Sequence, residues 1–134
     1  MRTILLATLL GSLVLAAQDK QVKKIPITPT PASSGKEMFN AYCAACHGTE
    51  GIGNGPAASA LKKAPADLTQ LAARNGGKFP SAHVYAVLSE VDSPVHGSKQ
   101  MPVWGPLLSS VSQSQGEVQL RINNLVNYVQ SLQK

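Results

Sequence analysis

Both cysteines of the 134-residue chain lie within four residues of each other, and a histidine follows the second one directly. The stretch Cys43-Ala44-Ala45-Cys46-His47 has the pattern C-x-x-C-H. In this pattern two thiols add across the vinyl groups of haem, and the histidine binds the iron. Two intervening residues let one turn of chain reach both vinyls. The spacing predicts one covalent haem c, with thioether bonds to Cys43 and Cys46 and His47 as an axial ligand of the iron.

Three other uses of the cysteine pair compete with this interpretation. A disulfide between residues this close would shorten the unfolded chain little and so stabilise little. A thioredoxin-like redox pair is expected beside a βαβ unit, and no such pattern is present. A structural zinc site needs a fourth ligand, and His83 and His96 are not arranged to complete one.

Haem iron accepts a sixth ligand, and methionine is the first candidate. Met1 lies in the N-terminal apolar segment, and Met38 lies one turn before the cysteines, on the wrong side of the attachment helix. Met101 remains, in the polar stretch "HGSKQMPVWG", and a thioether opposite an imidazole is a common pairing in haem electron carriers. His96 is the main rival ligand, and His83, expected on a helix surface, is a weaker one.

The N-terminal quarter of the chain has the composition of an export signal and a linker. Arg2 and the apolar run from Ile4 to Leu15 predict a signal peptide at 1–17, or an uncleaved membrane anchor. Residues 18–33 are polar and contain three prolines, which predicts a flexible tether. The folded domain is therefore expected at 34–134, outside the cytoplasm: periplasmic or otherwise exported, and possibly membrane-anchored.

Capping boxes predict the first and last helices of this domain. Ser34 precedes Glu37 by three residues, and Ser114 precedes Glu117 in the same way. After the second box, apolar residues recur at spacings of three and four up to Leu132, which predicts one apolar helix face. The opposite, polar face is expected to carry Arg121, Asn124 and Gln130.

The middle of the domain is expected to be helical as well. Short helices are predicted within 56–64, 66–74 and 81–91, and long loops within 47–56 and 94–106. No stretch alternates as a strand would. The expected fold is all-α, a bundle of four or five short helices wrapped around one haem. Aromatic residues make up only 4% of the chain, so a large cofactor would supply much of the core.

The chain resembles the class I c-type cytochromes from about residue 34 to residue 134. The resemblance rests on "CAACHG", on "MPVWG", and on a glycine and aromatic pattern in the two terminal helices: Gly35, Phe39, Cys43, Leu125 and Tyr128. It implies a cytochrome c-like bundle in which glycine allows the two helices to cross closely while the aromatics pack across the crossing.

Two further site residues are expected. Pro56 resembles the family proline whose carbonyl accepts a hydrogen bond from the ring N–H of the haem-binding histidine, which here supports His47. Trp104, three residues after Met101, is expected to line the haem crevice or to pack against the edge of the ring.

The expected function is electron transfer by a low-spin haem c with His47 and Met101 as axial ligands, without catalytic residues. The partners are expected to be a redox donor and acceptor, and Lys62, Lys63 and Lys99 could steer docking to an acidic surface. A net charge of +5 does not form a nucleic-acid-binding stripe. Two alternatives stay open. One is a sensor or peroxidase-like haem protein with a labile distal ligand. The other is a haem subunit tethered to a larger oxidase or dehydrogenase.

Overall fold

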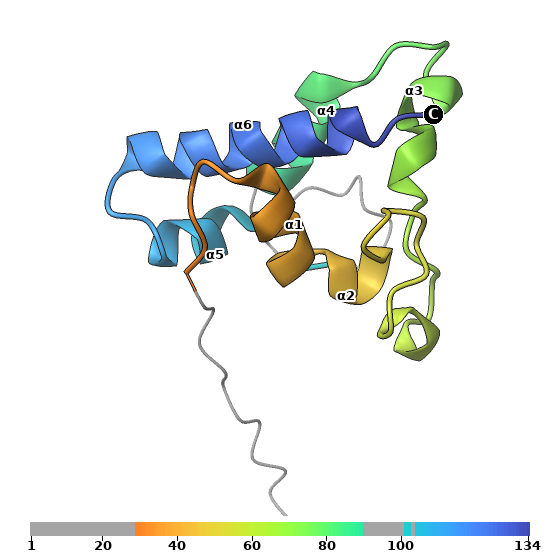
Figure 1. Ribbon diagram of the computed structural model, residues 1–134, viewed down its shortest axis with the longest axis horizontal. Helices are drawn as coiled ribbons and strands as arrows, with labels where there is room; N and C mark the ends of the chain where they lie inside the picture. The colour runs from red at the N-terminus through yellow and green to blue at the C-terminus, as the bar shows by residue number, and fades with distance from the viewer. Residues whose placement is uncertain (1–28, 90–100, 103) are drawn as a thin grey trace, which may run out of the picture.

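A computed structural model describes residues 29–89, 101–102 and 104–134 of the chain (Figure 1). The predicted signal peptide, most of the tether, His96 and Lys99 lie outside these residues. In the described ranges every regular element is helical, which confirms the all-α fold. The elements are α1 (Gly35–Tyr42), α2 (Ala44–His47), η1 (Ala58–Ala60), η2 (Leu68–Gln70), α3 (Leu71–Arg74), α4 (Ser81–Ser89), α5 (Trp104–Ser110) and α6 (Gln115–Ser131).

Both predicted capping boxes start helices. The Ser34 side chain accepts a hydrogen bond of 3.2 Å from the Glu37 N–H at the start of α1. The Ser114 side chain accepts one of the same length from the Glu117 N–H at the start of α6. Each bond satisfies a backbone donor that has no partner inside the helix. The starts of these two helices are therefore determined locally.

Helices α1 and α6 cross closely, and Figure 1 shows α6 lying across α1. At the crossing, a β-carbon on Gly35 would lie 2.1 Å from the carbonyl oxygen of Asn124 and 2.9 Å from the β-carbon of Tyr128. The rings of Phe39 and Tyr128 pack with centroids 5.2 Å apart and planes tilted by 55°. The expected roles of the glycine and of the aromatics are confirmed, because only a residue without a β-carbon permits this approach.

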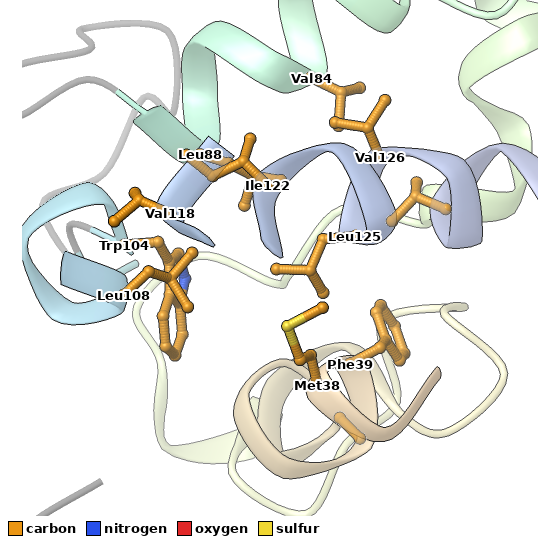
Figure 2. Close-up of a cluster of buried hydrophobic side chains, with 12 residues drawn as sticks. Met38, Phe39, Val84, Leu88, Trp104, Leu108, Val118, Ile122, Leu125 and Val126 are labelled. Atoms are coloured by element: carbon orange, nitrogen blue, oxygen red, sulfur yellow. The ribbon is translucent and has the colours of Figure 1, made fainter. Parts of the chain in front are cut away.

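The core lies between α1, α4, α5 and α6. In Figure 2, Leu125 points from α6 toward Met38 and Phe39 on α1. Met38, Phe39 and Leu108 are fully buried. The buried apolar side chains are Met38, Phe39, Ala44, Val84, Leu88, Trp104, Leu108, Val118, Ile122, Leu125, Val126 and Val129.

Two expectations for the middle of the chain were wrong. Only a 3-10 turn, η1, forms within 56–64, and residues 64–67 have no regular structure. Conversely, residues 104–106 were expected in a loop but begin α5. Pro106 is the third residue of that helix, and the first turn tolerates proline because its N–H groups have no partner inside the helix. The first predicted helix is also divided at Cys43 into α1 and α2, so the described part of the chain has six α-helices.

The expectation that Arg121 lies on an exposed polar face was also wrong. Its exposed fraction is 3%, and its guanidinium donates to the Glu117 carboxylate at 2.7 Å and to the Thr30 carbonyl at 2.7 Å. The Asn124 side chain donates to the Ala32 carbonyl at 2.9 Å. Arginine accepts this burial because its donors have partners. The last residues of the predicted tether are thus bonded to α6.

Candidate functional site

One helical turn brings the cysteines and the histidine together. Helix α1 ends at Tyr42, and α2 starts directly after Cys43. The N–H groups of Cys46 and His47 both donate to the Cys43 carbonyl, at 3.1 and 2.9 Å. The chain therefore turns tightly around Cys43, and all three side chains border the same hollow.

This first hollow extends from α2 to the start of α5. Its empty space amounts to about 680 Å³, counting the solvent at its mouth. Apolar and aromatic side chains form most of the wall. The lining residues are Tyr42, Cys43, Cys46, His47, Leu61, Lys63, Ala64, Pro65, Ala66, Met101, Pro102 and Trp104.

A second hollow, of about 740 Å³ on the same measure, reaches inward to α4 and α6. It shares Cys43, His47 and Met101 with the first, so these three residues stand where the two hollows meet. Its lining is almost entirely apolar: Phe39, Cys43, His47, Leu68, Leu71, His83, Val84, Val87, Leu88, Met101, Leu125 and Val129. Together the hollows offer a large apolar space bordered by two thiols, an imidazole and a thioether.

The His47 ring is oriented by a backbone carbonyl. Its Nδ1 lies 3.0 Å from the Ala66 carbonyl oxygen. Because a carbonyl only accepts, this bond requires a proton on Nδ1. In the neutral ring the lone pair of Nε2 is then free to bind a metal. Burial lowers the pKa of His47, and the hydrogen bond to Ala66 opposes this effect only in part. The ring is held neutral, as a metal ligand must be.

The prediction that Pro56 supplies this carbonyl is corrected by the structure. The N–H groups of Gly55 and Ala57 donate to the carbonyls of Cys46 and Ala45, at 3.0 and 2.8 Å. These bonds hold Pro56, which is exposed, against the carbonyl end of α2. The later segment that contains Ala66 reaches Nδ1 instead. Nothing in the residue type of Ala66 indicates this role.

Met101 lines both hollows. Met38 is fully buried in the helix crossing, where its sulfur lies 3.8 Å from the Arg121 guanidinium. His83 is an exposed residue of α4, as expected, but it also lines the second hollow. His96 is outside the described residues.

Trp104 forms part of the wall of the first hollow. Its exposed fraction is 7%, and its ring stacks on Tyr42 with centroids 5.6 Å apart. The Tyr42 hydroxyl lies 2.9 Å from the Thr30 hydroxyl. The sequence interpretation missed Tyr42, although its position directly before Cys43 places it next to the attachment turn.

The chemistry of the cysteines fits covalent attachment to haem. Both thiols are unpaired. Burial, together with repulsion from Cys46, raises the pKa of the Cys43 thiol to about 12, so Cys43 carries its proton. Burial therefore favours the thiol over the thiolate at Cys43, and the feature that covalent attachment needs is that neither cysteine is in a disulfide. In the described part of the chain, no three His, Cys, Asp or Glu side chains converge as ligands of a bare metal ion would.

Residues 30–114 match the family model described as cytochrome c oxidase, cbb3-type, subunit III. The chain belongs to this family. It is a cytochrome c domain of the cbb3 subunit III type, a mono-haem class I cytochrome c, as the resemblance in the sequence predicted. No curated protein and no solved structure matches the chain.

Membership of this family gives the site its general function. Cytochrome c domains transfer electrons through haem c and exchange them with redox partners, and those of the cbb3 subunit III type work outside the cytoplasm. The two cysteines of this domain are consistent with one covalent haem c. Within the described ranges, no helix has the length and apolarity needed to span a bilayer.

Proposed function

We propose that this cytochrome c domain carries single electrons through one low-spin haem c, bound by Cys43 and Cys46, with His47 and Met101 as the axial ligands. The observation that carries the proposal is the lining of the first hollow. Two unpaired thiols, a neutral imidazole and a thioether from a segment 54 residues further along the chain border the same apolar space.

A haem bound here supplies an iron that exchanges one electron without making or breaking a bond in a substrate. The chain keeps the ligands in place in both oxidation states. The Ala66 carbonyl fixes the tautomer and orientation of His47, and the hydrogen bond increases the basicity of the ring. Apolar side chains around both hollows would limit the contact between a bound haem and water. A rigid and dry site changes little when the charge on the iron changes, which favours rapid electron exchange.

The rest of the chain is proposed to serve delivery and docking. Residues 1–17 act as an export signal or an anchor, 18–33 as a tether, and 34–134 as the haem domain. Lys62 and Lys63 are exposed, and Lys63 lines the first hollow. The positive charge of Lys63 at that hollow, with Lys62 next to it in the chain, favours an acidic redox partner through long-range attraction. No catalytic role is assigned to any residue.

Optical spectroscopy of the exported protein with Met101→Ala tests the ligand assignment. We expect the ferric wild type to show the weak red-edge absorption band of thioether–iron ligation, and the reduced wild type not to bind carbon monoxide. Met101→Ala should lose the band and bind carbon monoxide readily. His83→Ala is the matched control, because His83 lines the second hollow but is not assigned as a ligand, and it should leave both properties unchanged.

Three outcomes would count against the proposal. An exported protein without haem would refute it entirely. If the wild-type protein lacks the band and binds carbon monoxide, a sensor or peroxidase-like function would be favoured instead. A changed spectrum in His83→Ala, with an unchanged one in Met101→Ala, would make His83 the distal ligand.

A further inference from the structure

The Ala66 carbonyl can orient His47 only if the segment that carries it is held in place. Residues 64–67 have no regular secondary structure, so helical hydrogen bonds do not fix them. Ala66 is exposed, and its position depends on what restrains the residues that follow it. The Arg74 guanidinium donates to the Asp67 carbonyl, directly after Ala66, and further restraints come from the far end of the chain.

The side chain of Gln133, which lies just after the end of α6, hydrogen-bonds to the backbone of both η2 and α3. Its amide nitrogen donates to the Leu68 carbonyl at 2.7 Å, and its amide oxygen accepts from the Ala72 N–H at 2.8 Å. The same nitrogen donates to the Val129 carbonyl at 2.8 Å, which keeps the side chain against α6. The neighbouring Lys134 N–H donates to the Thr69 carbonyl at 3.1 Å. The Gln133 side chain and the Lys134 N–H thus tie η2 and α3 to the C-terminal end of α6.

A few backbone contacts connect the segment bound by Gln133 to the His47 ring. Gln133 donates to the carbonyl of Leu68, and the N–H of Leu68 donates to the Gly51 carbonyl at 2.7 Å. Asp67 follows Ala66 and accepts from the Thr69 N–H and hydroxyl, at 2.9 and 2.7 Å. Because η2 is held between Gln133 and the loop after α2, the carbonyl two residues before Leu68 stays at hydrogen-bonding distance from His47.

We infer that Gln133 is a positioning residue for the iron-binding histidine: by fixing η2, it sets the strength of the His47–Ala66 hydrogen bond and through it the reduction potential. This inference rests on the proposed function, because it takes His47 as an iron ligand. A weaker bond makes the imidazole a poorer electron donor, which stabilises ferric iron less. Loss of the Gln133 contacts therefore raises the reduction potential.

The test compares two near-isosteric, uncharged variants of the haem-loaded protein. Gln133→Met keeps the length of the side chain but removes its hydrogen bonds. Gln130→Met is the control, since Gln130 lies one turn earlier on α6 and is exposed. We expect Gln133→Met to raise the reduced-to-oxidised ratio at a fixed ambient potential by a few-fold, up to about tenfold, which equals a positive shift of about 59 mV for one electron. Gln130→Met should leave the ratio unchanged.

A second measurement separates positioning from loss of stability. The His47 Nδ1 proton of the holoprotein, followed by NMR, should exchange with solvent at least about tenfold faster in Gln133→Met, while the α1 amide protons keep their rates. Gln133→Glu, which keeps the acceptor for the Ala72 N–H but loses the donor to Leu68, should exchange faster as well.

Each result bears on one claim. An unchanged potential and an unchanged Nδ1 exchange rate in Gln133→Met would overturn the positioning role, even if the protein became less stable. Uniformly faster exchange across α1 would do so too, since it would indicate general loosening. If the wild type shows no iron-shifted His47 resonance, the ligand assignment fails instead, independently of Gln133.

Discussion

The crossing of α1 and α6 offers a test of the fold with a magnitude that follows from the structure. In Gly35→Ala the new β-carbon would lie 2.1 Å from the Asn124 carbonyl oxygen and 2.8 Å from its carbon. Ordinary contact begins at 3.4 Å, so the two backbones must separate by about 1 Å locally. Neither atom belongs to a flexible side chain that could rotate away. The change must therefore open the helix crossing itself.

The cost is estimated from the contacts that this opening weakens. Overpacking in a dense core costs typically about 1–3 kcal/mol, and here backbone meets backbone, so the upper end applies. The Phe39–Tyr128 ring pair spans the same crossing, and such pairs contribute about 0.5–1.5 kcal/mol. Alanine regains less than about 1 kcal/mol of helix propensity, and little of it at the first helical residue. We expect a net loss of about 3 kcal/mol in the free energy of unfolding.

Urea denaturation of the haem-loaded protein measures this loss. With a denaturant slope of about 1–3 kcal/mol/M, a loss of about 3 kcal/mol lowers the midpoint by about 1–3 M. The matched control is Gly116→Ala in the first turn of α6, where the nearest atom to a new β-carbon is the Ser114 hydroxyl oxygen at 3.8 Å. The control should be neutral or slightly stabilising. A Gly35→Ala midpoint within about 0.3 M of the control would refute the reasoning.

Two further predictions concern charged side chains. Arg121→Ala should lower the free energy of unfolding by about 2–4 kcal/mol, because it removes the buried guanidinium that donates to the Thr30 carbonyl and pairs with the Glu117 carboxylate. A loss below about 1 kcal/mol in urea denaturation would contradict this. Hydrogen bonds from Thr69 lower the pKa of the Asp67 carboxyl in the folded protein. The ionised carboxylate therefore stabilises the fold at pH values above the pKa of an aspartate in the unfolded chain, about 4. This stabilisation is lost as the pH falls through the lower pKa of Asp67 in the folded protein. Asp67→Asn should therefore flatten the acid side of a plot of urea midpoint against pH, and an unchanged slope between about pH 2 and pH 5 would refute the assignment.

The turn that brings Cys43, Cys46 and His47 to one hollow, and the starts of the first and last helices, could be predicted from the sequence, because they depend on residues close together in the chain. The spacing of Cys43, Cys46 and His47 sets which atoms one turn can present to a haem. The serines at the two capping boxes need only the amide three residues ahead. A glycine and aromatics at helical spacings predicted the crossing of α1 and α6, although the partner residues lie far along the chain.

Tertiary structure alone decided which backbone carbonyl meets His47 and which polar side chains are buried. Every residue has a carbonyl, so no side-chain pattern distinguishes Ala66 from Pro56. The packing of the loop after α2 determines which of the two carbonyls lies next to the His47 ring. Arg121 has the helical position of a surface residue, and its burial depends on Thr30, 91 residues away. Gln133 reaches η2 across 65 residues in the same way. Contacts of this kind exist only once α6 has packed against the rest of the domain, and so they leave no local trace in the chain.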